Sequence, residues 1–209
     1  MTTHRSLIRR TALVAATAAA ALVLAACGGG GHDMGSMGDS SSPSTSATAQ
    51  AGDHNDADVS FAKEMIQHHR QAVDMAEMAD TRASSSEVKE LATKIKGAQD
   101  PEIKTMSGWL TSWGEDVPAD MDGMEGHDMS SAMPGMMSSE DMDRMEKASG
   151  AAFDKMFLEM MIKHHEGAVE MAKSEKTDGK YAAAKKLADD VIAAQTAEID
   201  QMKKLLNKS

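Results

Sequence analysis

The chain contains 209 residues, a length typical of a single domain or of two small repeats that share one core. Its only cysteine, Cys27, excludes an internal disulfide framework, a CxxC motif and a four-cysteine zinc site. A formal net charge of −11 argues against a nucleic-acid partner, because such binding depends on Lys and Arg contacts to phosphate. The 20 methionines, against three Phe, two Trp and one Tyr, are typical of a soft core or of soft-metal chemistry.

Residues 1–26 predict a lipoprotein signal peptide. Three arginines among the first ten residues precede a stretch rich in Ala, Val and Leu over residues 11–26, which is short for a membrane-spanning helix. This stretch ends in Leu24-Ala25-Ala26-Cys27, which resembles the bacterial lipobox, where the cysteine is lipidated and becomes the mature N-terminus. We therefore expect lipidation of Cys27 and an extracytoplasmic protein anchored to the cell membrane. Ordinary cleavage after Ala26 is the alternative, and the general secretory and twin-arginine routes both stay open.

Residues 27–56 consist mostly of Gly, Ser, Thr, Ala and Asp and contain almost no large apolar side chain. Such a segment cannot bury enough surface to offset the entropy of ordering, so it predicts a flexible tether. Within it, His32, Met34 and Met37 are candidates for weak capture of metal ions.

An internal repeat organises the remaining chain. Residues 61–76 read FAKEMIQHHRQAVDMA, and residues 157–172 read FLEMMIKHHEGAVEMA, an offset of 96 with nine of sixteen positions identical. The same offset aligns residues 88–110 with 184–206 without a gap. Each copy predicts a hairpin of two helices of about 20 residues, and two hairpins predict a four-helix bundle with a pseudo-twofold axis.

Helical periodicity supports an all-α fold. At 100° per residue, an arc of about 120° contains both histidines and the side chains of Phe61, Met65, Ala72, Met75 and Ala76, and the second copy repeats this arc. We expect a four-helix domain at residues 57–209, with hairpins at 57–113 and 140–209 and a Met-rich loop at 114–139. A kink or a short break is expected at Pro101, because a proline inside a helix removes a hydrogen bond.

Polar side chains on the predicted buried faces form the candidate metal site. An unpaired buried imidazole costs about 1–3 kcal/mol, so each ring needs a partner. These groups either form a structural network that fixes helix register or surround a metal ion, and four histidines flanked by methionine favour the metal. Adjacent helical residues diverge by about 100°, so the sequence leaves open whether both histidines of a pair face inward. The residues are His68, His69, His164 and His165 on the first helices and Gln99, Glu102, Gln195 and Glu198 on the second.

The residue types favour copper. Thioether and imidazole together suit copper, and thioether favours Cu(I), whereas hard cations need clustered loop carboxylates that the sequence does not show. Glu102 and Glu198, with Gln99 and Gln195, would then accept hydrogen bonds from the ring nitrogens that do not bind the metal. Methionine on a helix is also common as core filler. The predicted thioether ligands are Met65, Met75, Met161 and Met171.

The loop between the hairpins is a separate candidate, a low-affinity tract that collects copper. A linker with incidental methionines and a sink for reactive oxygen species are the alternatives. The tract comprises His127, Met121, Met124, Met129, Met133, Met136 and Met137.

Enzyme signatures are largely missing, and no catalytic residue is assigned. His165-Glu166 begins like HExxH, but position 169 is Val. The paired Glu-x-x-His of di-iron bundles is also absent, since Glu64 precedes His68 by four positions and the second copy has Met160 there. Two alternatives stay open: a lipoprotein bundle without metal that serves structure or interaction, and a di-metal redox enzyme.

The motif MIxHHxxAVxMA at residues 65–76 and 161–172 resembles the DUF305 family of bacterial secreted proteins. The AQxxEIxxM motif at residues 98–106, with Trp109 and Trp113, and the MPGMM motif at residues 133–137 are similar to the same family. The resemblance covers about residues 56–209. It implies a ferritin-like bundle and, for some members, extracytoplasmic copper binding and copper tolerance, with the four histidines and methionines from helices and loop as ligands.

We therefore predict a membrane-tethered, extracytoplasmic copper-binding protein that sequesters Cu(I) or Cu(II), or transfers it, without turnover. The expected partners are metal ions and the membrane, reached through the N-terminal lipid. A copper-handling protein and a second copy of this chain are further candidate partners.

Overall fold

The computed structural model describes residues 52–119 and 133–208. Within these ranges the secondary structure is entirely helical, which confirms the prediction of an all-α bundle. None of these helices is long and apolar enough to cross a membrane. Cys27 and the tether residues His32, Met34 and Met37 lie outside the described residues. The helices are α1 (Asp56–Arg82), α2 (Ser86–Trp113), α3 (Ser139–Lys147), α4 (Gly150–Asp178) and α5 (Ala182–Leu206).

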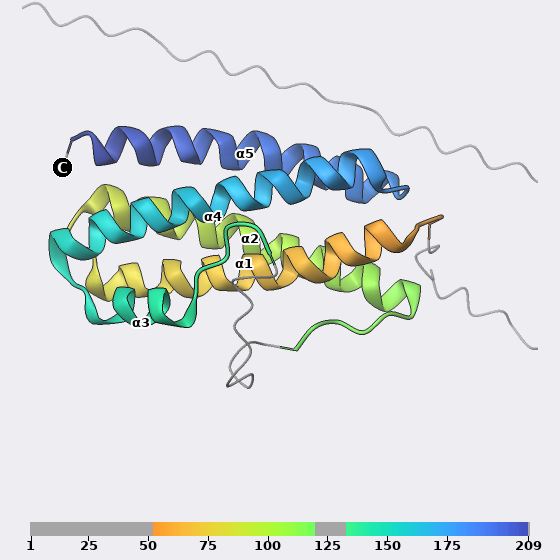
Figure 1. Ribbon diagram of the computed structural model, residues 1–209, viewed down its shortest axis with the longest axis horizontal. Coiled ribbons are helices and arrows are strands. Elements are labelled where there is room, and N and C mark those ends of the chain that lie inside the picture. Colours follow the sequence, from red (N-terminus) through yellow and green to blue (C-terminus); the bar gives the residue numbers. More distant parts are fainter. Residues whose placement is uncertain (1–51, 120–132, 209) are drawn as a thin grey trace, which may run out of the picture. The chain divides into compact units, whose positions relative to one another are not determined.

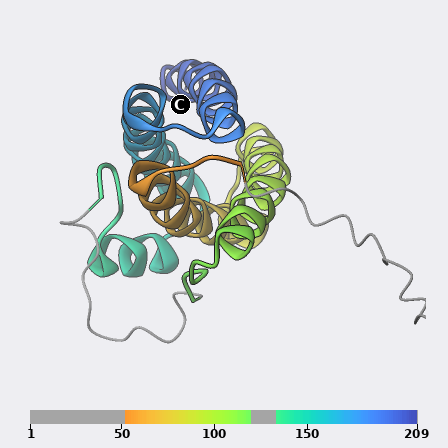
Figure 2. The same ribbon diagram turned by 90° about the vertical axis from the view of Figure 1, so that its right-hand side faces the viewer.

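The long helices form two hairpins, α1 with α2 and α4 with α5, and packing of α1 on α4 joins them (Figures 1 and 2). In each hairpin, a three-residue turn separates the helices, at residues 83–85 and 179–181. All four helices are longer than the predicted 20 residues. The short helix α3, which contacts α4, was not predicted as a separate element.

Pro101 does not break α2, which runs without interruption from Ser86 to Trp113. The expected short break is therefore wrong. The proline removes the helical partner of the Gly97 carbonyl, but both residues lie on the exposed side of the helix. Water can satisfy that carbonyl there, so packing of the buried face holds the helix together.

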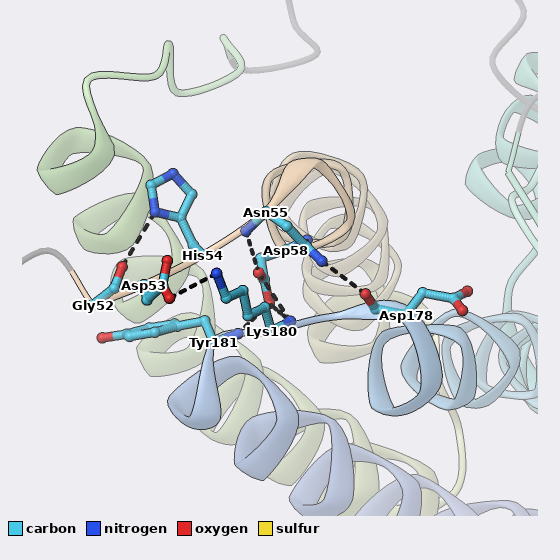
Figure 3. A network of polar contacts seen from close by, with 8 residues as sticks. All are labelled: Gly52, Asp53, His54, Asn55, Asp58, Asp178, Lys180 and Tyr181. Atoms are coloured by element: carbon cyan, nitrogen blue, oxygen red, sulfur yellow. Dashed lines mark hydrogen bonds and ion pairs between the residues drawn. The ribbon is translucent and has the colours of Figure 1, made fainter.

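Each hairpin supplies a carboxylate that caps the other hairpin. Asp58 of α1 accepts hydrogen bonds from the backbone N–H groups of Lys180 (3.0 Å) and Tyr181 (2.8 Å), immediately before α5 (Figure 3). Asp154, its repeat equivalent in α4, accepts from the backbone N–H groups of Ser84 and Ser85, both at 3.0 Å, before α2. Burial alone would raise the pKa of Asp58, but the backbone N–H groups of Tyr181, Asn55 and Lys180 and a hydrogen bond from the Glu175 side chain outweigh burial and lower it.

A layer of polar side chains divides the apolar core into two clusters. One cluster contains Phe153, Phe157 and the α3 residue Met145, and the other contains Phe61, Met106 and Leu110. On each long helix, the residues of the two clusters lie on either side of a histidine or glutamine position. The sequence places these polar positions at the same height in both repeats, so they meet in one layer.

Glu175 departs from the repeat, because its equivalent in the first copy is the buried Ala79. The Glu175 side chain is 2% exposed, no N–H group donates to either carboxyl oxygen, and the protonated carboxyl group donates to the Asp58 carboxylate. Burial raises the pKa of Glu175 to about 8, and the neighbouring Asp58 carboxylate adds to this rise.

This pKa predicts a pH dependence of stability. Native Glu175 holds its proton up to about pH 8, whereas the unfolded chain releases it near pH 4.5. The protonated carboxyl therefore favours the native state below about pH 4.5, and this contribution is lost as pH rises through 8. The wild type loses this contribution between pH 5 and 8, whereas Glu175→Gln has none to lose. We therefore expect the free energy of unfolding of the variant, relative to that of the wild type, to rise by at least about 1 kcal/mol from pH 5 to pH 8. Urea unfolding of the metal-free proteins at several pH values checks this, and parallel curves would contradict it.

Candidate metal centre

The structure brings all four predicted histidines into the polar layer. Their exposed fractions are 0% for His68, His69 and His165 and 1% for His164, so both members of each pair are buried. The first histidines of the pairs face each other across the α1–α4 contact. The second histidines each contact the other helix of their own hairpin.

His68 and His164 are repeat equivalents, and their ring centroids lie 3.7 Å apart with an interplanar angle of 42°. His68 Nε2 lies 3.0 Å from the carbonyl oxygen of Pro134. A carbonyl can only accept a hydrogen bond, so Nε2 of His68 carries the proton, and Nδ1 keeps a free lone pair. Nδ1 of His68 and both ring nitrogens of His164 have no hydrogen-bond partner.

His69 and His165 make the same contact in the two hairpins. Nε2 of His69 lies 2.7 Å from Glu102 Oε2, and Nε2 of His165 lies 2.7 Å from Glu198 Oε2. The Nδ1 atoms of both rings are buried without a partner. Carboxylates in this position fix the orientation of a ring and increase the basicity of its other nitrogen.

Gln99 and Gln195 complete the layer on the second helices. Both side chains are 3% exposed, and the Oε1 atom of each is buried without a hydrogen-bond partner. Each unpaired buried acceptor destabilises the fold by about 1–3 kcal/mol. The layer therefore contains polar groups to which the described residues offer no hydrogen bond.

The His68 and His164 rings are electrically neutral in this environment. Burial lowers the pKa of His68 to about 3, and repulsion from His69 and His165 contributes to the shift. Burial also lowers the pKa of His164 well below its usual value. Metal ions bind the neutral imidazole, so these two rings need no deprotonation before they act as ligands.

The four predicted helix methionines lie on both sides of the histidine layer. Met65 and Met171 belong to one core cluster, and Met75 and Met161 belong to the other. Three are fully buried and Met171 is 7% exposed. Each cluster therefore presents one methionine from α1 and one from α4 to the region next to the histidines.

Residues 133–137, which we call the strap, cross from α4 to α1 beside the histidine pair. The Gln71 side chain holds the strap by two hydrogen bonds, accepting from Met137 N (2.8 Å) and donating to Met137 O (3.0 Å). Gly135 has φ +77°, and a Cβ at Gly167 would lie 2.0 Å from the Pro134 carbonyl oxygen. The strap therefore needs glycine at both positions.

The strap buries three methionines of the predicted loop tract. Met133, Met136 and Met137 are 3–5% exposed, because burial of these apolar side chains against the helices is favourable. Their part in a tract that collects copper stays a prediction. Met121, Met124, Met129 and His127 lie outside the described residues.

No group of three or more His, Cys, Asp or Glu side chains in residues 52–119 and 133–208 is already arranged around one point. Imidazoles lie in the layer, and methionine thioethers lie on both sides of it. That mixture suits a soft ion such as Cu(I) and disfavours hard cations.

Gln71, Pro134 and Gly167 escaped the sequence analysis. Pro134 acts through its backbone carbonyl, which no residue pattern reveals. Positions 71 and 167 are repeat equivalents, and the unlike pair Gln and Gly within an otherwise repeated motif was the available signal.

The fold and the layer together define a duplicated-hairpin bundle with buried imidazoles that can serve as metal ligands. The chain belongs to the family described as "Domain of unknown function (DUF305)", whose model matches residues 58–206. The predicted family membership is thereby confirmed. Comparison with curated proteins gives no significant match.

Solved structures of the family are similar to this chain. The copper(II)-bound form of CopM is 40% identical with a TM-score of 0.62, and the copper(I)-bound form is 38% identical with a TM-score of 0.60. Each comparison covers 72% of this chain and 96% of CopM. A DUF305 protein from Streptomyces coelicolor, assigned as secreted, is 32% identical with a TM-score of 0.65, over 73% of this chain and 93% of that protein.

Proposed function

We propose that this protein binds copper outside the cytoplasm while tethered to the membrane through Cys27. It holds the ion for sequestration, tolerance or transfer to a copper-handling partner, and it catalyses no reaction. The predicted signal peptide and the secreted assignment of the Streptomyces relative support the location.

The observation that carries the proposal is the His68–His164 pair. Two neutral, fully buried imidazoles meet at 3.7 Å and offer three ring nitrogens without a partner. A structural network would have used these nitrogens, because unpaired buried polar atoms destabilise a fold. A bound metal ion would use the lone pair of His68 Nδ1 and that of one His164 nitrogen, because the other nitrogen of a neutral ring carries a proton.

Copper is the metal that the chemistry supports best. Methionine thioethers lie on both sides of the imidazoles, and this donor set favours Cu(I) over hard cations. The relative CopM has been solved with Cu(II), Cu(I) and silver, and silver is a soft ion of the same charge as Cu(I).

An anaerobic competition titration with Cu(I) tests the proposal. We would compare the wild type with a variant in which His68, His69, His164 and His165 are all Ala and every methionine is retained. The wild type is expected to bind tightly and to gain thermal stability with copper, since a ligand selective for the native state stabilises it. The variant is expected to lose tight binding and keep its helical content by circular dichroism.

Other outcomes separate the competing functions. Equal binding by both proteins would move the site to the methionines. A wild type whose thermal midpoint does not respond to copper would favour an interaction bundle without metal. Bound iron or manganese together with oxygen consumption would favour a redox enzyme.

A further inference from the structure

A groove of about 250 Å³ lies between the first half of α1 and the second half of α4. Its lining includes four acidic residues, Glu64, Glu170, Glu175 and Asp178, and no Lys or Arg. None of the four side chains forms an ion pair within the described part of the chain. Glu175 keeps its proton up to about pH 8, so the negative charge of the groove comes from the other three, Glu64, Glu170 and Asp178.

Glu175 gives a second reason to look for a cation here. It lines the groove with its carboxyl group buried, and the only hydrogen-bond partner of this group in the described part of the chain is another carboxyl group, that of Asp58. The buried Glu175 carboxyl group carries a desolvation cost that a cation in the groove would offset.

The repeat provides an internal comparison for this groove. The equivalents of Glu64, Ser174 and Glu175 in the other half of the α1–α4 contact are Met160, Met78 and Ala79. Those residues pack against the apolar cluster that also includes Met145 of α3, so the second half is covered. The same fold therefore builds this position from apolar residues, and the acidic lining is not a requirement of the bundle.

The groove leads toward the histidine pair. Pro134 of the strap forms part of its lining, and the Pro134 carbonyl accepts the hydrogen bond from His68. Glu64 lies one helical turn before His68 on α1. Met171 also lines the groove and belongs to the core cluster next to the layer. A cation in the groove thus lies near a thioether and next to the segment that covers His68.

We propose that this groove is the entrance through which a copper ion reaches the His68–His164 pair, an inference that rests on the proposed function. The carboxylates attract the hydrated ion, and Met171 is the first soft ligand on its way inward. The acidic side chains are not arranged as a chelate, so capture is weak and the ion passes on. Carboxylates that line a concave surface raise the rate of cation capture by electrostatic steering.

Stopped-flow mixing of the metal-free protein with Cu(I) in a weak acetonitrile complex measures the capture rate. The test variant is Glu64→Gln/Glu170→Gln/Asp178→Asn. The matched control, Glu90→Gln/Glu146→Gln/Asp200→Asn, removes the same charge from exposed positions outside the groove. We expect the association rate of the test variant to fall at least about tenfold at low salt and to lose most of its salt dependence, with less than about threefold change in the control.

A second variant, Ser174→Trp, fills the groove without removing charge. Association and dissociation rates are expected to fall together, so that the equilibrium dissociation constant stays within about twofold of the wild type. If copper associates with both groove variants at the rate of the control, the groove is not the entrance, although the protein still binds copper. A wild type that binds no copper would overturn the proposed function and the entrance with it.

Discussion

Replacing both His68 and His164 with Ala is expected to weaken Cu(I) binding at least about 100-fold, equivalent to about 2.8 kcal/mol. These rings supply three of the unpartnered buried nitrogens and need no deprotonation before they bind a metal ion. The metal-free variant should remain folded, because three of the four ring nitrogens that it removes have no hydrogen-bond partner, and the fourth, His68 Nε2, makes a single hydrogen bond to Pro134. Anaerobic competition titration gives the affinity, and circular dichroism checks the fold.

Two matched variants sharpen this prediction. Glu102→Gln/Glu198→Gln keeps all four rings and alters only the carboxylates that orient His69 and His165, so we expect a loss of about 10-fold. His54→Ala changes a histidine that precedes α1, far from the layer, and stacks on Trp113 with a ring-centroid distance of 4.4 Å, so this variant should leave the affinity unchanged. Copper binding by the His68/His164 variant at wild-type strength would refute the assignment.

Gly167→Ala is expected to destabilise the protein by about 2–4 kcal/mol. The added methyl group would lie 2.0 Å from the Pro134 carbonyl oxygen, a backbone atom, so the strap must move. Such overpacking costs about 1–3 kcal/mol, and displacement also endangers the two hydrogen bonds of Gln71 to Met137, each worth about 1 kcal/mol. Urea unfolding measures the change.

Gly108→Ala is the matched control for Gly167→Ala. Gly108 also lies inside a long helix, but a Cβ there meets nothing within 4 Å. We expect this substitution to stabilise the protein by about 0.5–1 kcal/mol, because alanine is the better helix former. Equal effects of the two substitutions would show that the strap does not require Gly167.

The fold could be predicted because the helical period and the internal repeat lead to the same arrangement of helices. The period selects the buried faces, and the 96-residue offset pairs His68 with His164. The two carboxylates that cap the opposite hairpins could also have been predicted, because Asp58 and Asp154 are separated by the same 96 residues. Extending the repeat upstream of residue 61 would have found them.

The strap could not be predicted from the sequence. Its hold on the helices depends on backbone carbonyls and on a glutamine amide 66 positions away, and neither follows a periodic pattern. Glu175 was missed for a related reason. It is a single departure from the repeat, and helical spacing does not distinguish a buried acid from one at the surface.

The exchanged caps have a consequence for how the two halves of the domain depend on each other. If the hairpins separated, Asp58 and Asp154 would lose their acceptor role, and the N–H groups before α2 and α5 would lose their buried partners. Neither half can therefore melt alone at low cost, and the domain is built to denature cooperatively. Two identical hairpins related by a true twofold could make the same exchange, so this chain has the architecture of a homodimer fused into one polypeptide.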